Sequence, residues 1–309
     1  MYQQLLETDQ IHCYAEDGRS INCENSGQDA TQGKKSLFHS RFEASDHLVR
    51  DNLTGAIWTR DANLSEFPLT WNEALSFVDD MRARQAHGHA HWQLPSRQFL
   101  FSLLSHQNIN PTLPNNHLFD NVFPGYYWTC DSCRRLPDQA WYVHLGGGRV
   151  HRGMKHGSYM VWPMSPGPQK AVNPDREEKA RFKADDACVH DAYTGLAWSI
   201  DANPAKHLFS WQEALSATHD FNHKKLGGFK DWRLPNIREL ESIVDLRSHS
   251  PAFPAGHPFI NVQEAYWSST TSVYEPRYAW TLYCRDGIVG VGFKPQKEFY
   301  TWPVRGGWQ

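Results

Sequence analysis

The sequence predicts an α+β fold that is used twice in one chain. Twelve of the thirteen tryptophans form six ordered pairs whose members lie 139 or 140 residues apart, and Trp308 alone has no partner. The same helix-start pattern and the same aromatic, strand-like runs occur once in each half. Repetition at a fixed spacing is typical of a duplicated domain. The pairs are Trp58 and Trp198, Trp71 and Trp211, Trp92 and Trp232, Trp128 and Trp267, Trp141 and Trp280, and Trp162 and Trp302.

Length and composition agree with two soluble globular domains. A chain of 309 residues, 40% hydrophobic and 21% charged, is long enough to bury two cores. The formal net charge of −3 gives no general attraction to nucleic acid, and no run approaches the roughly 18 apolar residues of a membrane span. We therefore expect neither a nucleic-acid partner nor membrane insertion.

Four segments are expected along the chain. Residues 1–45 form a polar N-terminal extension, 46–164 the first repeat and 186–309 the second repeat. Residues 165–185 between the repeats are rich in proline and charge and poor in large apolar side chains, which is typical of a linker.

Each repeat should begin with a hairpin and continue with a capped helix. The turn residues 52–55 and 192–195 precede apolar positions that lead to Trp58 and Trp198, which predicts strands there. Next come Thr70-x-x-Glu73 and Ser210-x-x-Glu213, the pattern in which a hydroxyl and a carboxylate satisfy free N–H groups at a helix start.

A second helix and several strands complete each repeat. Ser96 and Asn236 follow the sequence Trp-x-Leu-Pro and are good N-caps, with an apolar stripe of Ile237, Leu240, Ile243 and Val244 after Asn236. Proline-rich loops at 111–125 and 251–264 lead to the aromatic strands YYWTC and AYWSS. Two strands around Asp286-Gly287 and a last strand through Trp302 are expected to close the second repeat.

Six cysteines favour an oxidising compartment. Cys13 and Cys23 flank an Asp17-Gly18 turn, so a disulfide across that hairpin is expected. Cys188 and Cys284 align with leucines of the first repeat, and their joint presence predicts a second disulfide. Cys130 and Cys133 form a CxxC that could be a disulfide, free thiols, half of a metal site or a redox pair.

Several motifs together resemble a known bacterial family. TGLAW, SWQEAL, DWRLPNIREL, AYWSST and WPVRGG occur in that order in the second repeat, and the first repeat carries most of them in altered form. They resemble the family named after the C-terminal domain of the collagen-like adhesin Lcl, whose domains often occur in tandem. The N-terminal CYAEDGRSINCENSGQD also resembles the segment that precedes such domains.

The resemblance implies a C-type-lectin-like fold, an extracytoplasmic location and ligand binding, which in the adhesin concerns sulfated glycans. The first repeat departs from the family pattern, with HWQLPSRQFL in place of the DWRLP motif and MSPG in place of VRGG. The start of the chain lacks the basic and apolar segments of a secretory signal, so either the protein stays in the cytoplasm or its signal has been removed.

Two stretches are candidate ligand sites. Arg149, His151, Arg152 and Lys155 form a basic hairpin suited to sulfate or phosphate groups, and the alternative is a solvated hairpin without a ligand. In the second repeat, Tyr274, Glu275, Arg277 and Tyr278 lie in the loop where lectin-like folds vary most. That loop keeps only part of the calcium-binding motif of C-type lectins, and no calcium site is expected.

Other patterns are better explained by structure than by ligand binding. The paired tryptophans suit a core more than sugar stacking, because a large indole buries much apolar area. Asp231 and Arg233 become His91 and Gln93 in the first repeat, which favours a shared structural ion pair. The alternating His87, His89 and His91 could meet at a metal, but the aligned GFKD of the second repeat indicates a loop.

The sequence thus predicts a secreted or cell-surface binding protein, adhesin-like, that recognises a glycan, sulfated or not, or a protein partner. It carries no nucleotide-binding, zinc-protease or nucleophile-elbow motif, and we expect no enzymatic activity, cofactor or metal. One alternative is an oxidoreductase similar to the formylglycine-generating enzymes that would use Cys130 and Cys133. Another is a structural subunit of a surface assembly.

Overall fold

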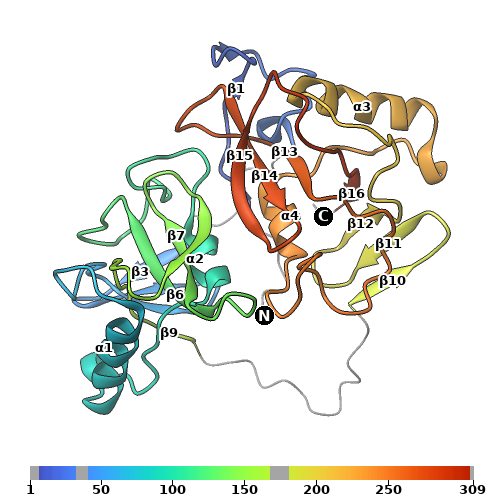
Figure 1. The fold of residues 1–309 in the computed structure, drawn as a ribbon. Coiled ribbons are helices and arrows are strands. Elements are labelled where there is room, and N and C mark those ends of the chain that lie inside the picture. Colours follow the sequence, from blue (N-terminus) through green and yellow to red (C-terminus); the bar gives the residue numbers. More distant parts are fainter. Residues whose placement is uncertain (1–6, 33–40, 168–180, 307–309) are drawn as a thin grey trace. The chain divides into compact units, whose positions relative to one another are not determined.

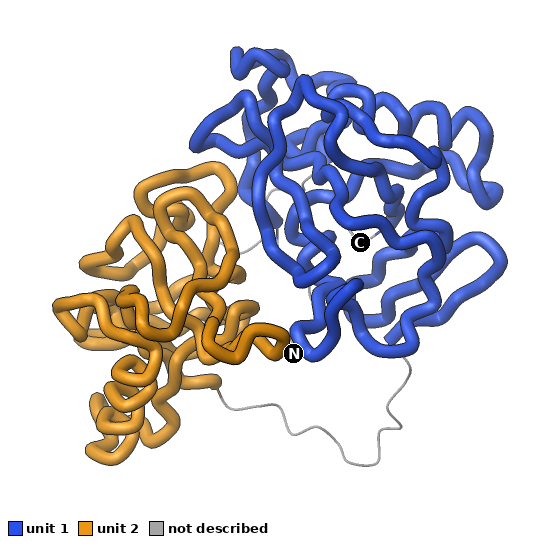
Figure 2. The backbone as a smooth tube through the Cα atoms, viewed as in Figure 1, with its two compact units in different colours: residues 1–35, 178–309 blue, residues 36–177 orange. Residues whose placement is uncertain are grey.

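A computed structural model describes residues 7–32, 41–167 and 181–306 (Figure 1). The chain divides into two compact units, one of residues 36–177 and one of residues 1–35 together with 178–309 (Figure 2). The N-terminal extension therefore belongs to the unit of the second repeat, although the first repeat follows it in the chain. Among the described residues, no helix is both long and apolar enough to cross a bilayer.

The first repeat is a mixed α+β unit with two antiparallel sheets. One sheet has the order β3-β4-β5-β9, and β6, β7 and β8 pair as consecutive antiparallel strands. Its elements are β3 (Phe42–Ala44), β4 (Leu48–Asp51), β5 (Ile57–Thr59), α1 (Trp71–Ala83), the 3-10 turn η2 (Ala86–Gly88), α2 (Arg97–Leu103), β6 (Tyr126–Ser132), β7 (Gln139–His144), β8 (Val150–Met154) and β9 (Met164–Ser165).

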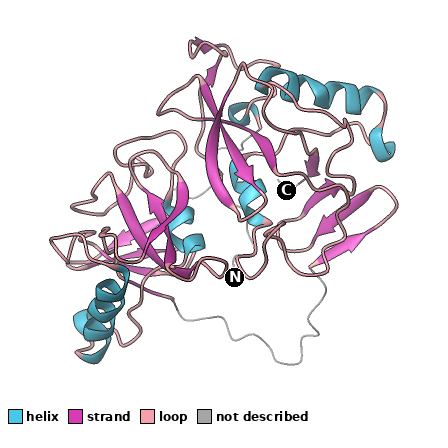
Figure 3. Cartoon of the chain, in the orientation of Figure 1, coloured by secondary structure: helices cyan, strands magenta, loops and turns pink. Residues whose placement is uncertain are grey.

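The second repeat has the same elements in the same order (Figure 3). Its first sheet has the order β10-β11-β12-β16, and β13, β14 and β15 pair as consecutive antiparallel strands. The elements are β10 (Phe182–Ala184), β11 (Cys188–Asp191), β12 (Leu196–Ser199), α3 (Trp211–His223), the 3-10 turn η3 (Leu226–Gly228), α4 (Ile237–Ser242), β13 (Ala265–Thr271), β14 (Tyr278–Tyr283), β15 (Ile288–Phe293) and β16 (Val304–Gly306). The predicted α+β duplication is confirmed.

The long helices begin where the sequence predicts. Thr70 and Ser210 each accept a hydrogen bond from the N–H of a glutamate three residues on, and that glutamate accepts one from the N–H of the capping residue. The shorter helices α2 and α4 begin after the predicted caps Ser96 and Asn236. Satisfying these free N–H groups fixes the start of each helix.

The tryptophan pairs form the cores, as predicted. Eleven of the twelve paired indoles are no more than 2% exposed, and Trp71 is the exception. Corresponding indoles also donate to corresponding backbone carbonyls: Trp162 to Thr59 at 3.0 Å and Trp302 to Ser199 at 2.9 Å. Shared burial and shared bonds explain why these residues keep their spacing in both repeats.

The first sheet of each repeat includes a strand that precedes the predicted starts at residues 46 and 186. Strands β3 and β10 lie in the segments expected to be extension and linker, and the preceding Arg41 and Arg181 anchor them. Arg41 forms an ion pair of 2.9 Å with buried Asp51, and Arg181 one of 2.7 Å with buried Asp191. The signal was present in the sequence, since RFEASD at 41–46 and RFKADD at 181–186 are one motif repeated.

The last strand of the second repeat begins later than predicted. It starts at Val304, two residues after Trp302. Pro303 lies between them and has no N–H to donate to a neighbouring strand, while its carbonyl accepts from Ser199 at 3.1 Å.

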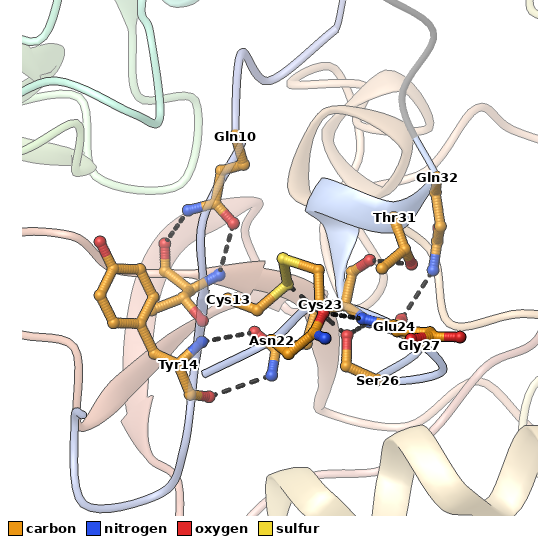
Figure 4. The surroundings of a disulfide bond; sticks show 12 residues. Gln10, Cys13, Tyr14, Asn22, Cys23, Glu24, Ser26, Gly27, Thr31 and Gln32 are labelled. Carbon is orange, nitrogen blue, oxygen red and sulfur yellow. Dashed lines mark hydrogen bonds between the residues drawn. A yellow bond between two sulfur atoms is a disulfide. The ribbon is translucent and has the colours of Figure 1, made fainter. Parts of the chain in front are cut away.

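One predicted disulfide is present and the other is wrong. Cys13 and Cys23 are bonded (Figure 4). The hairpin of β1 (Cys13–Tyr14) and β2 (Ser20–Ile21) turns at Gly18 with φ +86°. Cys188 and Cys284 are free and buried. Cys188 lies in β11 opposite Ser199, whereas Cys284 follows β14 and bonds through its backbone to Glu264 and Ala252, so each thiol fills a separate place in the packing.

Asp231 and Arg233 do have structural roles, but they are not each other's principal partner. Arg233 forms a bidentate ion pair of 2.6 Å with the fully buried Glu239 of α4 and donates to the Gly306 carbonyl. Asp231 pairs with Arg305 at 2.8 Å. The first repeat has Gln93, Phe99, His91 and Ser165 at the aligned positions, so the whole network is confined to the second repeat.

The N-terminal extension is built onto the second repeat. The side chain of Gln10 exchanges two hydrogen bonds with the backbone of Thr271 in β13, at 2.6 and 3.1 Å. The 3-10 turn η1 (Asp29–Thr31) brings buried Asp29 to the Thr270 hydroxyl, and Gln32 accepts from Arg233. These contacts cover the outer edge of β13.

Candidate ligand-binding surface of the first repeat

An aromatic and basic surface forms on one face of strands β6, β7 and β8. Side chains alternate between the two faces of a strand, and residues opposite each other share a face. The register places Tyr126 opposite His144, Trp128 opposite Tyr142, and Tyr142 opposite His151. These side chains therefore point to the same side of the sheet.

Tyrosines make up the centre of this surface. The ring of Tyr126 lies 4.9 Å from that of Tyr142, 4.7 Å from His144 and 5.3 Å from Tyr159. Tyr126 is 44% exposed, so its ring is open to a ligand. We call Tyr126, Tyr142, His144, Tyr159, His151 and Arg149 the tyrosine surface.

Tyr159 is held in place by the core beneath it. Its ring centroid lies 4.3 Å from that of buried Trp128, and its backbone exchanges two hydrogen bonds with Leu69. Gly153 in β8 allows this placement, because a Cβ there would overlap the Tyr159 ring. The surface thus has a fixed base of packed aromatic side chains.

The tyrosine surface carries neutral hydrogen-bonding groups beside a cation. Burial lowers the pKa of His144, and the nearby Arg149 guanidinium lowers it further. Burial also raises the pKa of Tyr142 to about 12. At neutral pH, His144 and Tyr142 are therefore uncharged and Arg149, which is exposed, supplies positive charge.

The structure divides the predicted basic set of the first repeat. Arg149 and His151 join the tyrosine surface, as their spacing suggested. Arg152 lies on the opposite face of the sheet, with its guanidinium 5.7 Å from the ring centroid of buried Trp141. Lys155 lies over Trp71, with Nζ 4.2 Å from the ring. The tyrosines were not among the predicted site residues, although their alternation with buried Tyr127, Trp141 and Val143 was an available signal.

The second repeat has no equivalent surface among its described residues. Ala265 stands in the register position of Tyr126, Thr281 in that of Tyr142 and Gly290 in that of His151. Tyr283 matches His144, and its ring packs 5.7 Å from Phe299. Neither a cation nor an imidazole is offered at these positions, so the tyrosine surface is particular to the first repeat.

The predicted loop residues of the second repeat do not converge. Tyr274 is 60% exposed, and Glu275 and Arg277 form an exposed ion pair of 3.0 Å with each other. Tyr278 lies in β14 with its ring 5.3 Å from Phe293. Glu275 and Arg277 thus bind each other rather than presenting free charges to a ligand. Gly18 of the extension also lies against Arg277.

The CxxC has the character of two separate thiols. Cys130 is exposed in β6 and Cys133 is buried after it, and the two are not bonded. Although Cys130 reaches solvent, the protein atoms packed around its sulfur raise the pKa of the thiol to about 12, and the Asp131 carboxylate contributes. Little thiolate is present at neutral pH, and the thiolate is the reactive form.

The histidine-rich loop forms no metal cluster. The rings of His87 and His89 pack against Trp92 at 6.2 and 5.9 Å. Across residues 7–32, 41–167 and 181–306, no three histidine, cysteine, aspartate or glutamate side chains gather in a way that could hold a metal ion.

Fold and surface together define a tandem pair of α+β domains in which one copy presents an open aromatic face. The profile of the Lcl C-terminal domain matches residues 47–165 and 187–305. The chain belongs to this family, with two tandem copies of its domain. A search among curated proteins found no match.

Proposed function

We propose that this protein is a non-catalytic, extracytoplasmic binding protein that recognises an acidic glycan through the tyrosine surface of the first repeat. The observation that carries the proposal is the grouping of exposed Tyr126 with Tyr142, His144 and Arg149 on a rigid sheet. Family membership and the Cys13–Cys23 disulfide, which persists in oxidising compartments, support the location and the binding role.

The chemistry of the surface suits a sugar that bears sulfate or carboxylate groups. Aromatic rings offer apolar faces to the C–H groups of a pyranose, and tyrosine hydroxyls and imidazoles bond its hydroxyls. Arg149 offers a planar fork of N–H donors for an anionic oxygen pair. Because Arg149 is exposed, its contribution should weaken with salt.

Titration of the whole chain with a sulfated polysaccharide and with its desulfated form tests the proposal. Tyr126→Ala should weaken binding of both forms, whereas Arg149→Gln should weaken only that of the sulfated form, by about tenfold, and reduce its salt dependence. Tyr274→Ala is the matched control, since Tyr274 is an exposed tyrosine of the second repeat. The proposal fails if neither polysaccharide binds, or if Tyr274→Ala alone abolishes binding.

A further inference from the structure

Trp71 and Trp211 occupy the same position in their repeats and differ in burial. Each is the first residue of a long helix and donates its indole N–H to a backbone carbonyl, Trp71 to Thr129 at 2.9 Å and Trp211 to Ser268 at 2.7 Å. Trp211 is fully buried and Trp71 is partly exposed. Since the local geometry is the same, the difference arises from what covers the ring.

The extension covers the face around Trp211. Lys294 Nζ lies 4.0 Å from the Trp211 ring centroid and donates to the carbonyls of Tyr14 and Ala15 at 3.3 and 3.4 Å. Gly27 lies against Leu215, close enough that a Cβ would touch its side chain. Trp211, Leu215, Lys294 and the edge strand at Thr271 thus form a face that holds the hairpin and the 3-10 turn of the extension, which we call the docking face.

The first repeat carries the same face, and no described residue of the extension covers it. Trp71, Leu75, Lys155 and Ser132 stand at the corresponding positions, and all four are partly exposed. By contrast, Trp211, Leu215, Lys294 and Thr271 are no more than 2% exposed. Lys155 keeps its place over Trp71. We call these four residues of the first repeat the open face.

One substitution changes which segment the open face can accept. In the docking face, the Thr270 hydroxyl donates to Asp29 of the extension at 2.6 Å. The first repeat has Asp131 in place of Thr270, and its carboxylate accepts from the Arg97 N–H at 2.6 Å. Asp29 would bring a second carboxylate to Asp131, and like charges in a partly buried site repel each other. This repulsion disfavours the extension of a second copy of the chain.

We propose that the open face docks a segment of a partner protein that carries a lysine or arginine where the extension carries Asp29. The edge of β6 supplies backbone groups, Trp71 and Leu75 supply apolar area, and Lys155 supplies a donor for partner carbonyls. In the docking face, the backbone of the edge strand bonds to the side chain of Gln10, so an exposed strand edge beside apolar side chains can hold a peptide segment. This inference does not rest on glycan binding.

The probe is a synthetic, disulfide-closed peptide of residues 7–32, made with the natural Asp29 or with Asp29→Lys. It is titrated into the whole chain, whose docking face is occupied by its own extension. The Asp29→Lys peptide should bind at least about tenfold more tightly than the natural one. Hydrogen exchange should then slow at 129–132 and stay unchanged at 268–272.

Variants of the chain place the peptide on the open face. Leu75→Glu should abolish binding, and Ser76→Glu, one exposed position further on, should not. Asp131→Thr, which restores the residue of the second repeat, should reverse the preference between the two peptides. The proposal is overturned if neither peptide binds, if Leu75→Glu has no effect, or if protection appears at 268–272 instead.

Discussion

The carboxylate of Asp29 accepts a hydrogen bond of 2.6 Å from the hydroxyl of Thr270, a residue 241 positions later in the sequence. The same hydroxyl accepts from the N–H of Ile237, the first residue of α4. Asp29, Thr270 and the start of α4 therefore form one buried chain of hydrogen bonds. This chain ties the extension to the second repeat, and it makes their association sensitive to pH.

Asp29 should make the second-repeat unit less stable as pH rises from 4 to 7. Burial raises the pKa of Asp29 from 3.8 to about 6. Because the pKa of Asp29 is higher in the folded protein than in the unfolded chain, its protonated form adds stability at pH values below the unfolded pKa. That stability is lost as the pH rises through the folded pKa. The change is on the order of 3 kcal/mol. Urea unfolding across this window should show that the wild type loses stability relative to Asp29→Asn as the pH rises, so the difference in their free energies of unfolding changes steadily with pH.

Glu24 provides the control for that comparison, because it is exposed in the same segment. Glu24→Gln should follow the wild type at every pH. A constant difference between wild type and Asp29→Asn from pH 4 to 7 would contradict the assignment.

Lys294 should have the opposite pH dependence in a higher range. Burial lowers the pKa of Lys294 from 10.5 to about 7. Its contribution to stability is therefore fully present above the unfolded pKa and is lost as the pH falls through the folded pKa. Lys294→Met should remove this loss between pH 10 and 7 in the same unfolding measurement. Lys155→Met is the matched control, since Lys155 lies over Trp71 but is partly exposed. Equal pH slopes for wild type and Lys294→Met would count against the prediction.

Removing the Cys13–Cys23 disulfide should loosen the extension and leave the first repeat unchanged. The bond closes a short loop, with a sequence separation of 10. Closing a loop of this size lowers the entropy of the unfolded chain and so stabilises the native state by about 3 kcal/mol. In a Cys13→Ser/Cys23→Ser variant, amide exchange should accelerate at 268–272, where the extension covers β13. Exchange at 129–132 should not change, and a uniform effect on both strands would disprove local coupling.

Arg233→Gln should destabilise the second repeat more than the double change Arg233→Gln/Glu239→Phe. The single variant leaves the fully buried Glu239 carboxylate without its bidentate partner, which typically costs about 3–5 kcal/mol. The double variant installs the pair found in the first repeat, Gln93 and Phe99, and removes the buried charge. Denaturant unfolding of both variants measures this, and a double variant less stable than the single one would be the contrary result.

The duplication and the main elements could be predicted from sequence because each has a local cause. Paired indoles fill corresponding places in two cores, and capping residues satisfy N–H groups within three positions. Strands β3 and β10 were also legible in RFEASD and RFKADD, but short polar strands have weak periodicity. Arg41 and Arg181 hold these strands through ion pairs with Asp51 and Asp191, which are tertiary contacts that strand periodicity does not reveal.

The disulfide between Cys188 and Cys284 was predicted wrongly because joint occurrence is not contact. Each cysteine replaces a leucine in a different packing environment, and burial raises the pKa of both thiols. The candidate site was half predicted: Arg149 and His151 follow from strand alternation, whereas Tyr126 and Tyr159 meet only after β6 and the segment following β8 are brought together.

The attachment of the extension could not have been predicted from any pattern in the sequence. Gln10 bonds to backbone atoms of Thr271, and Lys294 bonds to backbone carbonyls of Tyr14 and Ala15. Because every residue type has a backbone carbonyl, the identity of these partner residues does not reveal the contact. The choice of the second repeat over the first depends on Thr270 against Asp131, a difference that acquires meaning only when Asp29 lies beside it.

The position of the extension also sets the order of events during synthesis. Residues 7–32 leave the ribosome more than two hundred residues before Thr270, Thr271 and Lys294, which hold them. Translation at about 5–20 residues per second puts an interval of roughly ten seconds or more between the two. The extension can therefore take its place only after the second repeat has been made, and its two cysteines have that interval in which to meet an oxidant before the extension docks.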